Sequence, residues 1–320
     1  MEQVPAIIGD VVALTLGACV GSFAVTVAYR LPRDISIATP RSFCESCERP
    51  IPWWANIPIF AYLASRGRCL MCGAPIRARH LGGELALALA ALYLYANFPL
   101  GGAISRFSFI TALLVSSLVD YDWRLIPNLI TFPGVPVGFA LAALFMPEVG
   151  WKNSLIGIVA GGGVLFATGF IYQLVRKKEG VGLGDVFLLA MVGAFIGWQG
   201  VLFTLFFGAL LGSIGGLAVG LFGTPAQAPE PPPGMREAGA ASAPAAPSAA
   251  GAQAGAAAAA SQADRLAAAS IEPPAPDSAA AENEEHALLA TAVPFGPFLS
   301  LAAGFYTLFQ PQLASWYLSR

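Results

Sequence analysis

Two aspartates stand at the ends of apolar segments, where ionisable side chains are costly and are therefore candidates for function. Asp120 follows the apolar run 101–119, and Asp185 precedes the run 186–198. Two carboxylates within hydrogen-bonding reach share one proton, so one can act as a base while the other acts as an acid. A base that takes a proton from water and an acid that polarises a peptide carbonyl together carry out aspartyl proteolysis. The pair predicts such a site if the fold brings the two residues together.

Glycines precede the second aspartate, at Gly182 and Gly184. Glycine tolerates unusual dihedral angles and lets another backbone come close, so an extended substrate could lie against these two positions. Simpler roles for the aspartates remain open. Asp185 could cap the helix that follows it, and Asp120 could be solvated or pair with Arg124. An aspartate pair would also suit the proton relay of a proton-coupled transporter.

Four cysteines form two C-x2-C pairs, Cys44 with Cys47 and Cys69 with Cys72, separated by 21 residues. Four thiolates at this spacing suit a tetrahedral zinc ion, and a site with four protein ligands is structural because it leaves no position for water. The alternative is two disulfides, which do not persist in a reducing cytoplasm. Cys19 stands alone in an apolar run and is expected to be a small buried apolar residue.

The composition places the elements that carry these residues in lipid. The chain has 320 residues, of which 56% are hydrophobic and 11% charged, and its mean hydropathy is +0.67. So few charges exclude a soluble globule of this size, and only helices or closed barrels satisfy the backbone in a membrane. We therefore expect an all-α integral membrane bundle of about eight spans. The spans are expected near 6–29, 81–98, 101–119, 129–145, 155–175, 186–198, 201–222 and 298–318, with a tight reversal at Gln199-Gly200.

Basic residues predict the orientation of the spans. Eight arginines and three acidic residues lie between Arg30 and His80, so this loop is expected to face the cytoplasm. With alternating spans, Arg124 and the basic triplet 176–178 also fall inside, and the N-terminus falls outside. No basic residue precedes the first run, so we expect it to be retained and not cleaved as a signal peptide. Both aspartates then lie at the cytoplasmic edge.

The chain divides into five expected parts. Residues 223–288 are rich in Ala and Pro and have almost no aromatic or branched apolar side chains, which predicts a disordered cytoplasmic linker. The parts are a first transmembrane helix (1–29), a cytoplasmic four-cysteine zinc-binding loop (30–80), a catalytic transmembrane bundle (81–222), this linker (223–288) and a last transmembrane helix (289–320).

The order of these features resembles the type IV prepilin leader peptidase family. The resemblance covers the chain apart from the linker, and several independent motifs in order are more specific than any one of them. The matching pieces are Gly21-Ser22-Phe23, Arg30-Leu31-Pro32, the two cysteine pairs flanking Ile51-Pro52-Trp53 and Asn56-Ile57-Pro58, Gly83-Glu84-Leu85, Asp120-Tyr121-Asp122, Ile126-Pro127-Asn128, Gly182-Leu183-Gly184-Asp185 and Pro294-Phe295-Gly296-Pro297. Phe187 replaces a lysine, and Ala24 an asparagine, that are common in the family.

The resemblance implies an aspartyl endopeptidase of the bacterial inner membrane. It would remove the basic leader of prepilins or pseudopilins, for a type IV pilus or type II secretion, at the cytoplasmic face. It would then methylate the new N-terminus with S-adenosylmethionine, an activity implied by resemblance alone because no glycine-rich fingerprint for that cofactor is visible. The catalytic pair maps onto Asp120 and Asp185, with Asp122 in reserve, and the four cysteines match a zinc-type loop. No nucleic-acid partner is implied.

Two alternatives from other classes make different predictions. A proton-coupled transporter would hold its carboxylates nearer the middle of the bilayer than its edge. A non-enzymatic scaffold that docks a secretion partner through its zinc loop would tolerate aspartate substitutions but not cysteine substitutions.

Overall fold

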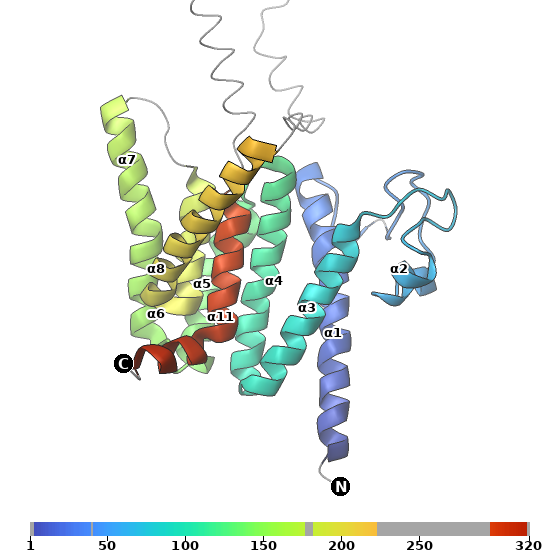
Figure 1. Cartoon of the computed structure of the whole chain (residues 1–320), viewed down its shortest axis with the longest axis horizontal. Coiled ribbons are helices and arrows are strands. Elements are labelled where there is room, and N and C mark those ends of the chain that lie inside the picture. Colours follow the sequence, from blue (N-terminus) through green and yellow to red (C-terminus); the bar gives the residue numbers. More distant parts are fainter. Residues whose placement is uncertain (1–2, 40, 177–181, 223–294, 319–320) are drawn as a thin grey trace, which may run out of the picture. The chain divides into compact units, whose positions relative to one another are not determined.

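The computed structural model describes residues 3–39, 41–176, 182–222 and 295–318, and this part of the chain is nearly all helical (Figure 1). Two isolated β-bridges in the loop that follows the first helix are the only β structure among these residues. The expected linker 223–288 lies outside the described residues. The longer helices are α1 (Gln3–Arg30), α3 (Ala78–Asn97), α4 (Leu100–Trp123), α5 (Asn128–Phe145), α6 (Gly150–Ile158), α7 (Val164–Arg176), α8 (Leu183–Phe222) and α11 (Gly296–Leu318).

Five described segments are long and apolar enough to cross a membrane, namely Ile7–Arg33, Leu100–Trp123, Asn128–Phe145, Gly150–Leu174 and Leu183–Ala218. The prediction of an all-α integral membrane protein is thereby confirmed. The number of eight spans stays a prediction.

The reversal expected at Gln199-Gly200 lies two residues earlier, at Gly197. This residue has φ 72° and ψ 179°, inside a segment that is otherwise helical from Leu183 to Phe222. Such a conformation is open to glycine at no steric cost and is unfavourable for residues with a Cβ. The hydropathy pattern could not place the break because apolar residues continue on both sides of it.

The first half of α8 packs closely against α6. A side-chain carbon on Gly157 of α6 would collide with the backbone of Gly193 in α8, so the two helices touch backbone to backbone. After α6 the chain passes through one π-helical segment, Val159–Gly163, before α7. This contact helps to fix the half of α8 that carries Asp185.

A buried core joins α4 to α8. The rings of Phe109 in α4 and Phe195 in α8 stack with their centroids 4.6 Å apart and an interplanar angle of 16°. Asp120 lies eleven residues after Phe109, and Asp185 lies ten residues before Phe195. Since the two helices run in opposite directions at this contact, both aspartates lie about 15 Å from the stacked rings, toward the same end.

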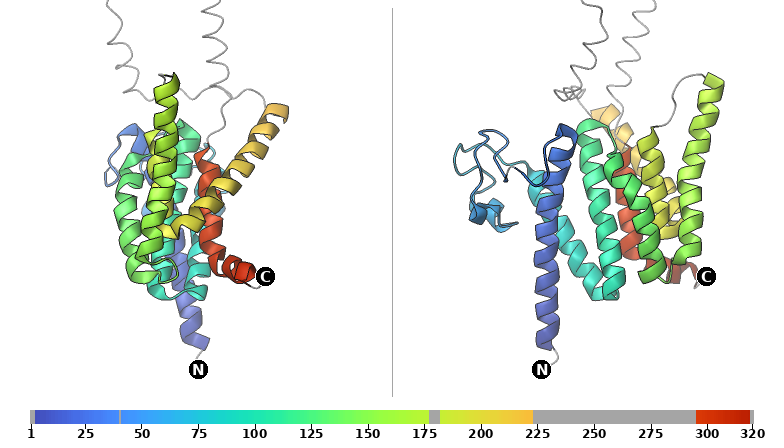
Figure 2. Two further views of the ribbon diagram at one scale, coloured as in Figure 1. Left: turned by 90° about the vertical axis from the view of Figure 1, so that its left-hand side faces the viewer. Right: turned by 180° about the vertical axis from the view of Figure 1, so that it is seen from behind.

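The first and third helices form a second close pair, which Figure 2 shows side by side from behind. Gly17 and Gly21 of α1 lie against the backbone of α3 at Leu87 and Glu84, where neither glycine leaves room for a side chain. Between the two helices the described part of the loop contains, besides the two β-bridges, three short helical turns: η1 (Leu31–Arg33), η2 (Trp53–Asn56) and α2 (Phe60–Ala64).

Candidate carboxylate site and four-cysteine metal centre

Asp120 lies in the last turn of α4 and is buried, with 7% of its surface exposed. Its carboxylate Oδ2 accepts a hydrogen bond from the backbone N–H of Gly296, at 2.9 Å. Gly296 begins α11, so the start of one helix donates a backbone amide to the end of another. A Cβ on Gly296 would lie 2.5 Å from Oδ2, which leaves no room for a side chain.

Asp185 lies in the first turn of α8 and is half-buried. Its own N–H bonds to the carbonyl oxygen of Gly182 at 3.1 Å. Gly184 is a point of close approach, because a Cβ there would lie 2.9 Å from the Cβ of Ile126. Ile126 belongs to the short connection between α4 and α5, so this glycine brings the start of α8 against the chain that follows Asp120. Gly182 is exposed and has more room.

The fold places Asp120 and Asp185 at the same end of the helices. Gly184, next to Asp185, lies against Ile126, which follows Asp120 by six residues. The two aspartates are 65 positions apart in the sequence. They lie at the same end because α4 ends and α8 begins on the same side.

Asp122, the reserve candidate, points to a different partner. Its Oδ2 accepts a hydrogen bond from the Arg79 guanidinium near the start of α3, within an ion pair. Both side chains are largely shielded from solvent, at 18% exposure for Arg79 and 20% for Asp122. Asp122 therefore fastens α4 to α3, whereas Asp120 faces α11 and α8.

Arg79 also reaches the four-cysteine loop. Its guanidinium lies 3.9 Å from the carboxylate of Glu45, which is further paired with Arg77 at 3.5 Å. The hydrogen bond from His80, with the charges of Arg77 and Arg79, holds the pKa of Glu45 below its usual range, against the opposing effect of burial. A chain of charged contacts thus runs from the loop to the last turn of α4.

The four cysteines of the loop converge on one point. Their sulfur atoms all lie within 4.8 Å of one another, and the Sγ atoms of Cys44 and Cys72 are 3.9 Å apart. Tetrahedral zinc with Zn–S bonds of about 2.3 Å requires sulfurs separated by about 3.8 Å. The four thiols therefore fit one tetrahedral metal ion.

The two cysteine pairs have matching backbone turns. Cys44 donates its N–H to Arg49 at 3.0 Å, and Cys69 donates its N–H to Ala74 at 2.8 Å. The residue after each pair adopts positive φ, at 56° for Glu48 and 73° for Gly73. The turns aim both sulfurs of each pair at the same point, which is the arrangement that the sequence predicted for the pairs.

The thiols are free and chemically ready for a metal. All five cysteines of the chain are unpaired, so no disulfide forms. Backbone amides of Cys72 and Met71 lower the pKa of the Cys69 thiol to about 6, which favours the thiolate that a metal binds. The pKa of the Cys72 thiol is raised to about 11, because burial and the other three thiols outweigh its hydrogen bond from the Ala74 backbone. The prediction that Cys19 is buried is wrong, because the side chain is exposed on α1. The face of α1 that packs on α3 carries Gly17 and Gly21 instead.

Sequence reasoning gave no site role to Arg79, Ile126 or Gly296. Gly296 occurs within a segment already noticed for its resemblance, and a glycine beside a helix start is a signal for close approach. Arg79 was counted only among the arginines that orient the loop. Its partner Asp122 lies 43 residues away, a pairing that depends on how α3 packs against α4.

The fold and site define a class of protein: a polytopic helical membrane protein with two aspartates at one end of its helices and, in the adjoining loop, four thiols that could hold a metal ion. Comparison with protein families places it further. The model of the bacterial peptidase A24 N-terminal domain matches residues 15–98, which include the four cysteines. The model of the type IV leader peptidase family matches residues 107–217, which include both aspartates.

Similar proteins carry the same family's names. A prepilin leader peptidase/N-methyltransferase of Myxococcus xanthus (strain DK1622) is 31% identical over 307 residues, covering 93% of this chain and 90% of the relative. One of Burkholderia pseudomallei (strain 1026b) is 34% identical over 66% of this chain and 75% of its own length. One of Klebsiella pneumoniae is 35% identical over 62% of this chain and 89% of its own length. No solved structure matches the chain. The chain belongs to the type IV leader peptidase family.

Proposed function

We propose that this protein is a membrane aspartyl endopeptidase that removes the leader peptide of type IV prepilins or pseudopilins. The observation that carries the proposal is the placement of Asp120, in the last turn of α4, and Asp185, in the first turn of α8, at the same end of the helices. Family membership supports the same reaction, and the relatives are named for it. The comparisons give no support to a transporter, and both aspartates lie in terminal turns of helices and not near their middles.

The reaction follows from one proton shared by two carboxylates. The ionised carboxylate takes a proton from water as the water oxygen adds to the scissile carbonyl carbon, and the protonated one gives its proton to the carbonyl oxygen. Collapse of the tetrahedral intermediate breaks the C–N bond and passes a proton to the leaving amine, so the pair again holds one proton. The hydrogen bond from Gly296 fixes the orientation of the Asp120 carboxylate for these transfers.

The cleaved bond would lie on the cytoplasmic side of the inner membrane. The excess of arginines between Arg30 and His80 supports this orientation. A prepilin would present the junction between its leader and its apolar helix at this edge. The five-part division of the chain, with the segment 223–288 as a linker, belongs to the same proposal.

The four-cysteine centre would hold a structural zinc ion through Cys44, Cys47, Cys69 and Cys72. When bound, the ion supplies no open coordination position and joins the two turns into one unit. These two cysteine turns also position Glu45, which contacts Arg79. The metal would thus act on the carboxylate site through the charged contacts between the loop and α4.

Methylation of the new N-terminus is the second proposed activity, supported by the names of the relatives. S-adenosylmethionine would supply an electrophilic methyl group to the amine that cleavage releases. A cavity of about 390 Å³ lies between the end of α1 and the four-cysteine loop, lined among others by Tyr29, Tyr62, His80 and Glu84. Its volume is within the range of small-molecule sites. Its aromatic side chains and Glu84 suit a cationic sulfonium, and its five arginines suit the carboxylate at the amino-acid end of the same molecule. We therefore place the methyl donor there.

Amide variants of the aspartates test the peptidase. We expect Asp120→Asn and Asp185→Asn each to lower leader removal by about 10²–10⁴-fold, the range for loss of a general acid or base. Asp122→Asn is the matched control, because it makes the same chemical change on a residue bound to Arg79. It should slow cleavage far less than either, because it weakens the ion pair with Arg79 but removes no catalytic proton. Wild-type cleavage by both Asp120→Asn and Asp185→Asn would contradict the mechanism.

Mass spectrometry of a co-expressed prepilin separates the two activities, because loss of the leader and gain of a methyl group change the mass differently. Tyr62→Ala at the cavity wall should leave the leader removed and the methyl group absent. Equal methylation by this variant and the wild type would exclude the cavity.

A further inference from the structure

One segment of the four-cysteine loop has a composition unlike the rest of it. The loop contains eight arginines between Arg30 and His80, yet residues 50–65 carry no charged side chain. The segment holds two tryptophans, a phenylalanine, a tyrosine and several aliphatic residues, and it folds as η2 and α2. Arg49 and Arg66 stand at its two ends.

The large apolar side chains of this segment are not covered by the protein. Trp53 is 73% exposed and Phe60 77%, while Leu63 is 62% and Trp54 54% exposed. Four such side chains within eleven residues form an apolar surface that would be unfavourable in water. Another apolar medium must therefore cover them.

The segment is fastened at the level of the membrane helices. The backbone N–H of Ile59 donates to Glu84 Oε2 of α3 at 2.7 Å, and the Cα of Glu84 lies where a side chain on Gly21 would be. Gly21 is nine residues before the end of α1 at Arg30, about 14 Å along the helix axis. Ile59 holds a positive φ of 65°, which is unfavourable for a β-branched residue. The bond to Glu84 secures this turn.

Figure 1 shows the consequence: α2 lies beside α1 and α3, not beyond their ends. A cavity between the segment and α1 is lined by Trp53 and Pro58 on one side and by Cys19 and Phe23 on the other. Cys19 and Phe23 belong to the apolar span Ile7–Arg33. Trp53 of the segment therefore lies across this cavity from Phe23, which is 55% exposed on a membrane helix.

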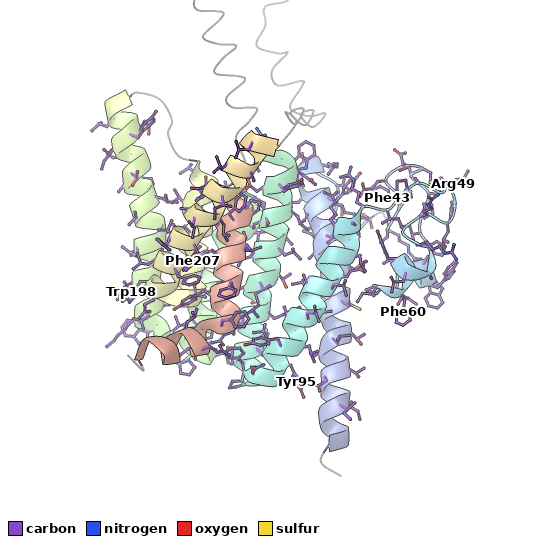
Figure 3. All side chains as sticks on the ribbon, viewed as in Figure 1. Phe43, Arg49, Phe60, Tyr95, Trp198 and Phe207 are labelled. Carbon is purple, nitrogen blue, oxygen red and sulfur yellow. The ribbon has the colours of Figure 1, made fainter. Side chains whose placement is uncertain are left out.

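We propose that residues 53–63 form an interfacial anchor that lies in the membrane leaflet on the loop's side. Tryptophan is enriched at membrane–water interfaces, and apolar faces flanked by basic residues insert at the boundary between headgroups and acyl chains. Figure 3 shows Phe60 and Arg49 on opposite sides of the loop, so the apolar side can face lipid while the basic side faces headgroups or water. The anchor would hold the four-cysteine centre and its contact to Arg79 at the membrane edge.

Fluorescence quenching tests the anchor without reference to any activity. The full chain is reconstituted in phosphatidylcholine–phosphatidylglycerol vesicles whose acyl chains are brominated at shallow or deep positions. Subtracting the emission of the W53F/W54F variant from that of the wild type isolates the two tryptophans. We expect shallow bromines to quench this difference emission by about two-fold or more, deep bromines less, and iodide in the water little.

Two measurements control the experiment. The variant W151F calibrates an interfacial tryptophan, since Trp151 is 55% exposed at the start of the span Gly150–Leu174. Bound zinc in W53F/W54F shows that its loop is folded. Quenching by iodide would place the segment in water. Protection from both quenchers would show that protein, such as a second copy or a substrate, covers it. Either result would overturn the proposal.

Discussion

At the scale of single residues, the carboxylate site depends on a glycine as much as on its acids. Gly296 donates its N–H to Asp120 from a helix that begins 176 residues later in the chain. A side chain there would meet Oδ2 at 2.5 Å and the carboxyl carbon at 3.0 Å. The Asp120 carboxylate can therefore take this orientation only because Gly296 has no side chain.

We expect Gly296→Ala to lower leader cleavage by about 10²-fold, because displacing a catalytic group by about 1 Å can cost that much. Gly304→Ala is the matched control. It makes the same change in the same helix at a position where a Cβ meets nothing within 4 Å, and alanine is the better helix former. Cleavage rates of the two purified variants on one prepilin decide the matter. Equal rates would show that the contact with Asp120 has no catalytic effect.

At the scale of elements, apolar runs predicted the helices but not what lies between them. The placement of Asp120 and Asp185 at one end could be predicted, because spans that alternate in direction put the end of α4 and the start of α8 on one side. The break at Gly197 could not, because several glycines near it fit the same hydropathy pattern and the choice depends on packing. The pairing of Asp122 with Arg79, and the contact of Gly296 with Asp120, are tertiary contacts that no local pattern records.

The contact between the loop and α4 makes a prediction about coupling. Arg79 pairs with Asp122 and lies 3.9 Å from Glu45, which is adjacent to a cysteine of the metal centre. Zinc removal by a chelator should slow cleavage in the wild type. In Arg79→Gln, cleavage should already be slower, and zinc removal should add little, because residues in one network show interaction energies of about 0.5–3 kcal/mol.

Arg77→Gln is the control for this cycle, since Arg77 pairs with Glu45 at 3.5 Å and makes no ion pair with Asp122 among the described residues. Its response to zinc removal should match the wild type. Cleavage rates of the wild type, Arg79→Gln and Arg77→Gln, each with and without chelator, measure the coupling between zinc binding and Arg79. Additive effects of zinc removal and Arg79→Gln would mean that the loop acts on the site by another route.

At the scale of the whole molecule, one end of α4 holds the carboxylate site and the other end joins the helix to its neighbours. Its last turn holds Asp120 and Asp122, and Arg106, about 21 Å back along the helix, is 2% exposed and pairs with Glu148 between α5 and α6. The Arg106 guanidinium also lies over the ring of Phe98, 4.0 Å from its centroid. This cluster joins α4 to its neighbours at the end remote from the carboxylates.

Substitutions at the Arg106 end of α4 should therefore change the stability of the protein without changing the rate of leader cleavage. Glu148→Gln leaves the Arg106 charge buried without its partner, which should cost roughly 1–3 kcal/mol of the free energy of unfolding, while the rate of leader cleavage at a permissive temperature stays unchanged. Glu48→Gln, the same change at an exposed loop carboxylate, should leave both quantities as they are. Thermal unfolding in detergent and cleavage of one prepilin measure the two properties. The opposite outcome is a loss of cleavage activity in Glu148→Gln without a lower melting temperature. That result would show that the Arg106 end of α4 affects the carboxylate site, and the two ends of α4 would not have separate roles.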